Sequence, residues 1–294
     1  MQPPLLSHVR SQVLPPPPGR VSRWWLVVAG AGLVLAAVWL TGWLSQRSDG
    51  RAGLPERLRI GFAIEAPYAY LTEDGRVTGE SPEIARRVAA RLGYGEPEWV
   101  LTEFGSLVTQ LREGRFDVVA SGLFVTAERE RLVAFSRPTL SVRPALLVAA
   151  GNPRELHSYA DVARWGHVRV AVVAGSVEAE MLAGEGVPAE RIVLVPDPPS
   201  GLALLKSGRV DGLALSRPTV VWLAALPAHA GTLEAAEPFE VSSTLSSARV
   251  AHAFRQEDKA LRRAWDEALA GFLQGDEHRE LLRGLGLADG EGVP

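Results

Sequence analysis

Residues 106–121 have the sequence SLVTQLREGRFDVVAS, and residues 200–215 have the sequence SGLALLKSGRVDGLAL. At an offset of 94 residues, six of the sixteen positions are identical. Each stretch predicts a helix, a glycine that ends it, a basic and an acidic residue, and a buried strand. The repeat is too widely spaced for a solenoid, so it predicts two similar α/β lobes of about 100 residues each. Chance similarity between helix–strand units is the alternative explanation.

The same alternation of strand and helix continues on both sides of these stretches. A helix is predicted over 81–92, where Ser81 can cap the first turn, Pro82 suits the first helical position and Gly93 follows the end. Short apolar runs predict further strands at 58–63, 99–101, 146–149, 168–173 and 192–195. Strands that alternate with helices are typical of an α/β fold with mainly parallel pairing.

The repeated aspartates, Asp117 and Asp211, come at the starts of the two buried strands. Ligands of open α/β sheets usually bind at the carboxyl ends of strands rather than at their starts. We therefore expect both aspartates to be structural, and to cap the backbone or pair locally with Arg115 and Arg209.

Composition excludes several classes of protein. The chain has 294 residues, no cysteine, 31 Lys and Arg, and 34 Asp and Glu, which gives a formal charge of −3. The lack of cysteine excludes disulfides, cysteine-bound metal centres, a thiol nucleophile and a lipid-modified cysteine. The nearly balanced charge argues against a nucleic-acid-binding protein, which usually has a basic face. The six histidines never occur at metal-ligand spacing, and nucleotide-binding and serine-hydrolase motifs are missing, so no metal or cofactor is expected.

Residues 24–44 (WWLVVAGAGLVLAAVWLTGWL) carry no charge and are long enough to span roughly 30 Å of bilayer. Tryptophans near both ends, and arginines before the run, predict a transmembrane helix with a cytoplasmic leader over 1–23. The run is longer than a secretory apolar segment and lacks a good cleavage site, which favours an anchor over a cleaved signal. Residues 45–57 are expected to form a linker, and 289–294 a tail.

The stretch SGLFVTAER at 121–129, followed by VAFSRP at 133–138, resembles the signature of extracytoplasmic solute-binding proteins of the polar-amino-acid ABC importer type, family 3. LRIGFAIEAPYAYL at 58–71 and GESPEIA at 79–85 agree with this resemblance in order and spacing. The ectoine/hydroxyectoine-binding branch is the most similar. The resemblance implies a type II periplasmic-binding-protein fold with two lobes and two crossover strands. Lobe 1 would comprise 58–145 and 247–288, and lobe 2 would comprise 146–246.

The resemblance also implies a function. The chain would be the substrate-binding component of an ABC importer, would close its lobes over a small zwitterionic solute such as ectoine, hydroxyectoine or a polar amino acid, and would deliver it to a permease and its ATPase. It would be an extracytoplasmic, monomeric binding protein and not an enzyme. Two alternatives stay open: a dehydratase acting on cyclohexadienyl or arogenate-like acids, and a membrane-tethered sensory domain. A murein-cleaving enzyme is not expected, since only a glycine-rich tail follows residue 287.

Lobe 1 offers most of the candidate binding residues. A guanidinium in a cleft can hold a carboxylate through two parallel hydrogen bonds, and the resemblance gives this role to Arg129, three residues after Thr126. A surface ion pair with a neighbouring glutamate is the alternative for Arg129. Aromatic residues from three loops match the family's cage for a delocalised cation, and a nearby acid could accept its N–H groups; these residues are Tyr68, Phe104, Phe124 and Glu65. Core packing is the alternative for the rings, and a solvated loop charge for the acid.

Lobe 2 contributes fewer candidates. Ser176 precedes a helix whose free N–H groups could bind a carboxylate, although it could simply cap that helix. Asp197 follows another predicted strand and could reach the ligand, but the prolines after it depart from the ectoine-binding branch. Relatives that bind amino acids often have an acidic residue after the strand at 210–215, where this chain has Ser216 and Arg217. This difference favours a zwitterion with a diffuse positive charge.

Overall fold

The computed structural model describes residues 54–241 and 248–287. The predicted leader, membrane span and tail, and most of the predicted linker, lie outside the described residues. Among the residues that are described, no helix is both long enough and apolar enough to cross a membrane.

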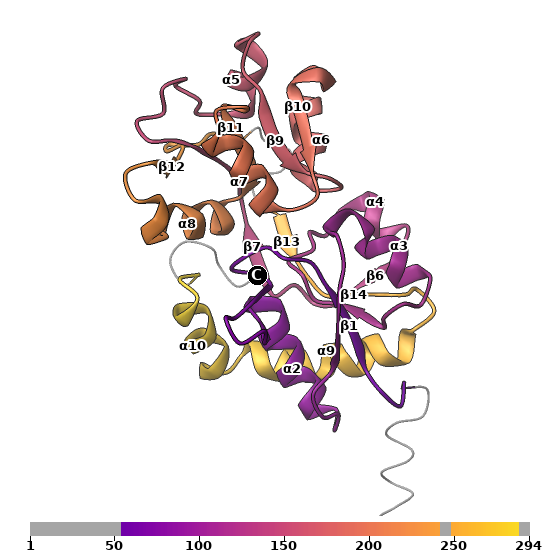
Figure 1. The fold of residues 1–294 in the computed structure, drawn as a ribbon. Helices are drawn as coiled ribbons and strands as arrows, with labels where there is room; N and C mark the ends of the chain where they lie inside the picture. The colour runs from indigo at the N-terminus through magenta and orange to yellow at the C-terminus, as the bar shows by residue number, and fades with distance from the viewer. Residues whose placement is uncertain (1–53, 242–247, 288–294) are drawn as a thin grey trace, which may run out of the picture. The chain divides into compact units, whose positions relative to one another are not determined.

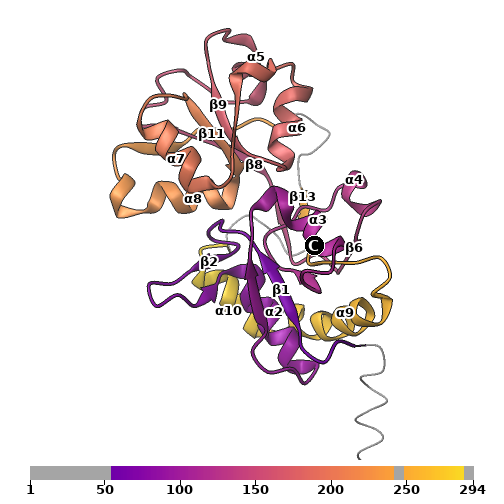
Figure 2. The ribbon, with the colours of Figure 1, turned by 45° about the vertical axis from the view of Figure 1, so that its right-hand side comes forward.

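Lobe 1 is built on a five-stranded sheet in the order β4-β1-β5-β14-β6. Its helices α2 and α9 pack together below the sheet as Figures 1 and 2 draw it. The strands of this sheet are β1 (Arg59–Phe62), β4 (Glu98–Leu101), β5 (Val118–Val119), β6 (Ala134–Phe135) and β14 (Ala253–Phe254). The helices are α2 (Glu80–Arg91), η1 (Phe104–Ser106), α3 (Leu107–Arg112), α4 (Ala127–Glu130), α9 (Lys259–Leu273) and α10 (Asp276–Gly284), and β2 (Tyr70–Leu71) pairs with β3 (Val77–Thr78).

Lobe 2 has a second five-stranded sheet, in the order β10-β9-β11-β8-β12. Its strands are β8 (Pro144–Ala149), β9 (Val170–Val173), β10 (Ile192–Val195), β11 (Gly212–Ser216) and β12 (Leu233–Ala235). Its helices are α5 (Tyr159–Arg164), α6 (Val177–Gly184), η2 (Ala189–Arg191), α7 (Pro198–Lys206), α8 (Arg217–Ala225) and η3 (Pro227–His229). The prediction of two similar α/β lobes is therefore confirmed.

Two short strands connect the lobes. β7 (Leu140–Val142) leads from lobe 1 into β8 of lobe 2, and β13 (Ala248–Val250) precedes β14 of lobe 1. They pair antiparallel, with Ser141 opposite Arg249. Two adjacent crossovers form a narrow connection, which is the kind of element that permits hinge closure of two rigid bodies. The exact lobe boundaries, at residues 145 and 246, stay a prediction.

The pairing of the strands is mixed, so the prediction of mainly parallel sheets was only partly right. In lobe 1, β1 is parallel to β4 and β5, but β14 is antiparallel to both β5 and β6. In lobe 2, β9 is parallel to β10 and β11, but β8 is antiparallel to β11 and β12. The antiparallel strands are those next to the crossovers, where the chain enters a sheet without a preceding helix.

The predicted cap of the first helix was wrong. α2 begins at Glu80, after Gly79, and Ser81 lies within its first turn. Gly79 has a φ of 115°, and a Cβ there would come within 2.5 Å of the Tyr68 carbonyl oxygen, so only glycine permits this entry. Ser81 instead accepts a hydrogen bond from the Gly122 N–H at 3.0 Å, and its own hydroxyl donates to Glu80. Ser81 is therefore used in tertiary contacts, and its local sequence context wrongly indicated a helix cap.

The two repeated aspartates are structural, as expected, but their predicted partners were wrong. Asp117 accepts from the Arg59 backbone N–H at 3.1 Å, and its carboxylate is 2.9 Å from the Arg59 guanidinium and 3.1 Å from that of Arg255. Asp211 accepts from the Arg169 N–H at 3.0 Å and pairs with Arg154 at 2.9 Å. Each aspartate therefore connects its strand to the start of the neighbouring parallel strand.

Apolar burial stabilises each lobe on both faces of its sheet. In lobe 1, Trp265, Leu269 and Phe272 of α9 are fully buried against α2. In lobe 2, the alternate residues of β9 and β11 face two different clusters, as expected for a sheet with helices on both sides. Each fully buried large side chain contributes about 1.5–3 kcal/mol. Rigid lobes keep the carboxyl ends of the central strands, where the candidate site lies, in fixed positions.

Candidate functional site

A small cavity lies where the carboxyl ends of the central strands of the two lobes meet. Its wall comes from Glu65, Phe104, Gly122, Phe124, Arg129, Val173, Ser176, Val177, Glu178 and Leu215. Five of the eight predicted site residues are therefore brought together. Its volume is about 10 Å³, which is about the room that one water molecule needs. A solute can enter only after the lobes separate or the side chains rearrange.

Arg129 is held by a short helix that begins in the signature sequence. Thr126 caps α4 by accepting the Arg129 backbone N–H at 3.2 Å, so the predicted Thr126 acts by positioning Arg129. The Arg129 guanidinium donates to the carbonyl oxygens of Phe124 at 2.8 Å and of Gly175 at 2.9 Å. Burial lowers the pKa of Arg129, and the charge of Glu178 opposes that shift. A half-buried cation bonded to carbonyl groups is a suitable partner for an incoming carboxylate.

The three predicted aromatic residues are all buried, and two of them line the cavity. The Phe104 ring lies 5.8 Å from the Arg129 guanidinium carbon. Tyr68 lies behind the wall: it packs on Gly122, where a Cβ would come within 2.6 Å of the Tyr68 ring, and its hydroxyl donates to Ser216 at 3.0 Å. Two rings thus face the cavity, and the third supports it.

Glu65 follows β1 and lines the cavity opposite lobe 2. It accepts a hydrogen bond from the Thr219 hydroxyl of α8 at 2.9 Å. Burial of the carboxyl raises its pKa to about 8, and the charge of Glu178 adds to this shift. An enclosed carboxyl group beside two aromatic rings can bind a cation that brings N–H donors.

Glu178 was not among the predicted site residues, although it lines the same cavity. It is the second residue of α6, is 5% exposed, and its pKa is raised by burial. Ser176 precedes this helix, and its buried hydroxyl lies beside the Glu178 carboxyl. An acid in the first turn is common for helix-dipole reasons alone, so the position of Glu178 in the sequence does not indicate that it faces the cleft.

The structure does not bring Asp197 to the cavity. Its carboxylate accepts the Ser200 backbone N–H at 2.8 Å and caps α7, whose first residues are the two prolines noted above. Proline at the first helical position fixes the entry to the helix, which leaves the aspartate in the capping position.

Several contacts join the lobes directly around the cavity. Tyr68 bonds to Ser216, Glu65 to Thr219, and Arg129 to the Gly175 carbonyl. The backbones also touch, since a Cβ on Gly105 would lie 2.9 Å from the Ala174 carbonyl oxygen. At the rim, the Tyr70 ring of lobe 1 lies 5.4 Å from the Trp222 ring of lobe 2. These contacts describe a closed arrangement of the two lobes.

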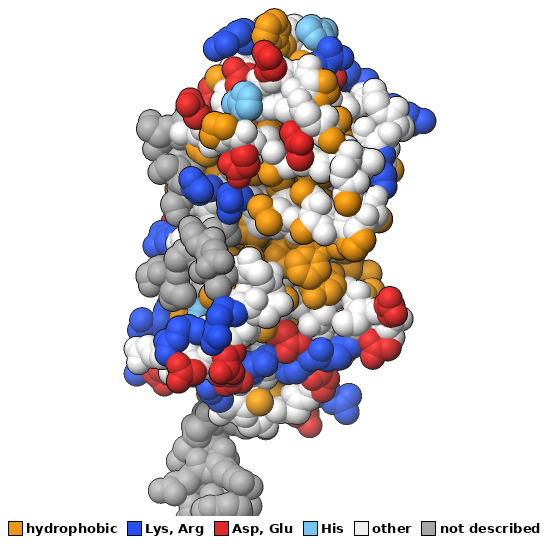
Figure 3. Space-filling view, turned by 90° about the vertical axis from the view of Figure 1, so that its left-hand side faces the viewer, with side chains coloured by type: hydrophobic (Ala, Val, Ile, Leu, Met, Phe, Trp, Pro, Cys, Tyr) orange, Lys and Arg blue, Asp and Glu red, His pale blue; other side chains and the backbone are white. Residues whose placement is uncertain are grey.

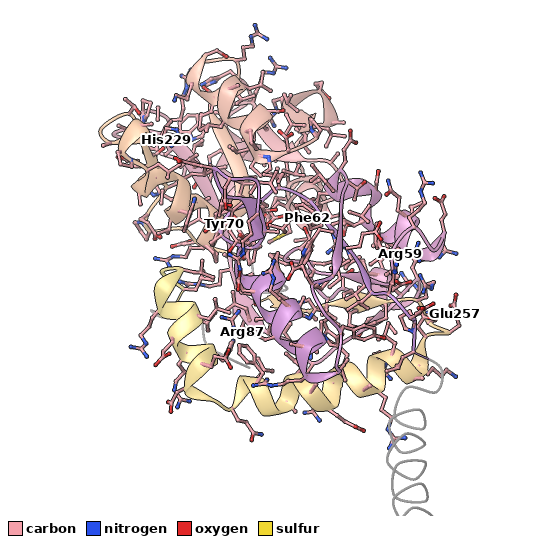
Figure 4. All side chains as sticks on the ribbon, turned by 60° about the horizontal axis from the view of Figure 1, so that its bottom comes forward. Arg59, Phe62, Tyr70, Arg87, His229 and Glu257 are labelled. Atoms are coloured by element: carbon pink, nitrogen blue, oxygen red, sulfur yellow. The ribbon has the colours of Figure 1, made fainter. Side chains whose placement is uncertain are left out.

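The surroundings of the cleft differ from the far side of lobe 1. In Figure 4, Tyr70 lies beside lobe 2, whereas Arg59 lies away from it, at the start of β1. Figure 3 shows charged side chains of both signs on the two lobes and hydrophobic side chains gathered between them. Within the described residues, no group of three His, Cys, Asp or Glu side chains is placed to hold a metal ion.

Two α/β lobes that close over a cavity lined by an arginine, carboxyl groups and aromatic rings define a solute-binding protein with the type II periplasmic-binding-protein fold. Residues 58–284 match the family of bacterial extracellular solute-binding proteins, family 3, and the chain belongs to this family. The resemblance inferred from the sequence motifs is thereby confirmed. The family is extracellular and its members bind small amino-acid-like solutes in cooperation with ABC permeases, which places the lobes outside the cytoplasm.

Two relatives are similar over most of the chain. A probable amino-acid ABC transporter periplasmic-binding protein of Sinorhizobium fredii is 34% identical over 276 residues, which cover 92% of this chain and 88% of that protein. The crystal structure of EhuB in complex with hydroxyectoine has a TM-score of 0.73 and 31% identity, and covers 82% of this chain and 90% of that one. The first is described as a probable binding protein, and the second was solved with hydroxyectoine bound.

An enzyme is similar in sequence to part of this chain. A membrane-bound lytic murein transglycosylase F of Idiomarina loihiensis is 32% identical over 189 residues, which cover 61% of this chain but 40% of that protein. The similarity spans less than half of the enzyme.

Proposed function

We propose that this protein is the substrate-binding component of an ABC importer and that it captures a small zwitterionic solute by closing its two lobes. The observation that carries the proposal is that Arg129 and Glu65 both line one cavity, whose wall comes from both lobes. A cation and a carboxyl group that line one cavity together with two aromatic rings match the two ends of a zwitterion.

In this proposal the solute carboxylate binds Arg129. When the lobes open, the Arg129 guanidinium loses the Gly175 carbonyl, which belongs to lobe 2, and keeps the Phe124 carbonyl of its own lobe. The freed N–H groups can then bind a carboxylate, and the buried Ser176 hydroxyl can donate to it once the lobes close. The same charge-assisted bonds would hold the two lobes together.

The positive end of the solute would lie against Phe104 and Phe124, with Glu65 accepting its N–H groups. Ser216 and Arg217 occupy the place where relatives that bind α-amino acids often carry an acid. The hydroxyls of Ser216 and of the nearby Thr219 are already used in the contact between the lobes. Aromatic faces suit a delocalised cation. We therefore propose a cyclic amidinium zwitterion, ectoine or hydroxyectoine, before a polar amino acid.

Titration calorimetry with ectoine, hydroxyectoine, proline, glycine betaine, arginine and glutamine tests this proposal. We expect ectoine or hydroxyectoine to bind with a dissociation constant in the micromolar range or below, and the others at least tenfold more weakly. Tight binding of arginine or glutamine alone would shift the ligand class to a polar amino acid. No binding by any compound would contradict the proposed function.

A dehydratase remains the second candidate, because a carboxyl group that stays protonated at neutral pH can act as a general acid. Glu65 meets this condition, since burial raises its pKa to about 8. Incubation with arogenate or prephenate, followed by the absorbance of the aromatic product, decides between the two. We expect no turnover, and turnover that Glu65→Gln abolishes would favour the enzyme.

We further propose that residues 24–44 anchor the protein to the outer face of the cytoplasmic membrane and that it acts there as a monomer. The supporting observation is the uncharged, tryptophan-flanked sequence of this segment. Sequencing of the amino terminus of the membrane-associated protein tests the anchor, since cleavage would produce a new terminus near residue 45. A membrane-tethered sensory domain would instead be indicated by a partner other than a permease in cross-linking.

A further inference from the structure

The cleft contains more carboxyl groups than the binding of one zwitterion requires. Glu65 and Glu178 both line the cavity, together with one arginine, Arg129. Glu65 is bonded to Thr219 on α8, and Glu178 lies at the start of α6 beside the loop whose Gly175 carbonyl accepts from Arg129. Glu65 therefore lies beside α8 of lobe 2, and Glu178 lies at the start of α6.

The charged and titratable groups around the pair come from several elements. Glu178 faces Arg129 of α4, Tyr159 of α5 and Glu65 of the loop after β1. Arg129 is also influenced by Glu180, on the same helix as Glu178, and by Glu128. Burial and the charge of Glu178 raise the pKa of Tyr159 well above 10, so Tyr159 stays neutral up to pH 9.

Charge balance limits how the two acids can be ionised together. With one proton shared between Glu65 and Glu178, these two groups and Arg129 carry no net charge. Burial raises the pKa of both acids, and the charge of Arg129 opposes this shift at Glu178, so we assign the shared proton to Glu65. A bound zwitterion would place a positive end beside Glu65 and a carboxylate beside Arg129, and therefore near Glu178. Two carboxylates in one enclosed site repel each other strongly, and one of them takes up a proton.

We propose that Glu178 is a specificity-determining residue that becomes protonated when a zwitterion binds, while Glu65 becomes ionised. This inference rests on the proposed function. One proton leaves the Glu65 carboxyl group for solvent as the lobes close, and one proton from solvent joins the Glu178 carboxylate. The net charge of the cleft and the net number of protons are unchanged near neutrality. A solute with two negative ends, or with no positive end, cannot drive this exchange and is disfavoured.

The proposal predicts a characteristic pH dependence of binding. Hydroxyectoine is a suitable probe because it keeps both of its charges between pH 5 and 9. For wild-type protein we expect constant affinity near pH 7 and a decrease on both sides, by up to about tenfold per pH unit. The decrease in affinity at acid pH reflects protonation of Glu65. The decrease at alkaline pH reflects loss of the proton from Glu178.

Two single variants separate these effects. Glu178→Gln should lose the alkaline decrease and release a proton on binding hydroxyectoine at pH 7, since only Glu65 then titrates. Glu65→Gln should bind more weakly, lose the acid decrease and take up a proton at pH 7. Titration calorimetry in buffers of different ionisation enthalpy measures these proton numbers, and wild-type protein should give a number close to zero. Circular dichroism confirms that each variant is folded.

Glu180→Gln is the matched control, because Glu180 is exposed, lies two residues further along the same helix, and does not line the cavity. It should retain the wild-type profile. If Glu178→Gln and wild-type protein release the same number of protons on binding, the inference is overturned while the proposed function remains intact. A wild-type protein that binds hydroxyectoine without any decrease at alkaline pH would also overturn it. Failure of the wild-type protein to bind at every pH would instead contradict the proposed function, and this inference with it.

Discussion

The two lobes have the same framework but contribute different chemistry to the cleft. After β5, the chain of lobe 1 supplies Phe124 and Arg129; after β11, the equivalent strand of lobe 2, it supplies the hydroxyl groups of Ser216 and Thr219. The hydroxyl groups of lobe 2 bond to Tyr68 and Glu65 across the cleft. We infer that lobe 1 provides most of the affinity for the solute, and that lobe 2 mainly stabilises the closed state.

The two frameworks are alike down to single hydrogen bonds. Asp117 and Asp211 each accept the backbone N–H of the residue that starts the neighbouring strand, Arg59 or Arg169. Those two arginines in turn donate to the carbonyl groups of Arg115 and Arg209 in the repeated sequence. The contacts at the starts of the strands are thus the same in the two lobes, whereas the residues at the cleft ends differ.

The largest effect on binding should follow from Arg129→Ala, because the solute carboxylate would lose its only cationic partner among the residues that line the described cavity. We expect a loss of about 3–5 kcal/mol in binding free energy, measured by calorimetry. Arg131→Ala is the matched control, since Arg131 is exposed and lies two residues further on. Equal effects of the two substitutions would contradict the proposed contact between Arg129 and the solute carboxylate.

Acid should destabilise lobe 1 through His252, which is 1% exposed and accepts from the Trp265 indole at 3.1 Å. Burial lowers the pKa of His252 to about 4, below the ordinary value of 6.5, so the unfolded chain binds the proton more tightly. The stability due to neutral His252 is complete above about pH 6.5 and is lost as the pH falls toward 4, by about 3 kcal/mol in total.

Tryptophan fluorescence can assign this acid effect to a lobe. Trp265 lies in the core of lobe 1, whereas Trp165 of lobe 2 is 40% exposed. Trp222 on α8 also belongs to lobe 2, so both Trp165→Phe and Trp222→Phe are needed to leave only tryptophans of lobe 1 among the described residues. In urea titrations, this double variant should show a free energy of unfolding that decreases between pH 6.5 and 4, and His252→Gln should reduce that slope. An unchanged slope in His252→Gln would show that other groups determine the acid response.

The sequence predicted the two lobes from the repeat, and it predicted half of the residues that line the cavity through the family resemblance. The repeat at residues 106–121 and 200–215 encodes helix, turn and strand, and the signature sequence places Arg129 three residues after its cap. Five of the predicted residues line one cavity because they follow the carboxyl ends of strands, where parallel sheets collect such side chains.

The features that the sequence did not predict depend on contacts between distant segments. Ser81 is taken up by a hydrogen bond from Gly122, which lies 41 residues away, so its local capping signal was misleading. The arginine partners of Asp117 come from positions 58 and 138 residues away. Glu178 faces the cleft only because α6 packs with Arg129 nearby, and nothing in its own neighbourhood distinguishes it from exposed Glu180.

The duplicated aspartates should differ in their contributions to stability. The Asp117 side chain is 5% exposed and pairs with two arginines, whereas that of Asp211 is 20% exposed and pairs with Arg154. Asp117→Ala should cost about 3 kcal/mol, because it leaves partly buried cations without a partner, and Asp211→Ala about 1 kcal/mol. Urea unfolding of the two variants measures the difference. A larger loss of stability for Asp211→Ala would contradict the expectation that Asp117 contributes more to stability than Asp211.

The smallest effect should come from the hydrogen bond between the lobes at the back of the cleft. Tyr68→Phe removes the hydroxyl that donates to Ser216 at 3.0 Å, while the ring stays packed on Gly122. Because this bond forms only when the lobes close, its loss should weaken solute binding by about 1 kcal/mol and leave the stability of lobe 1 unchanged. Ser216→Ala should give a similar loss, and the double variant no more than either one. A larger, additive loss in the double variant would mean that the two residues act independently, and lobe 2 would then contribute to affinity through more than closure.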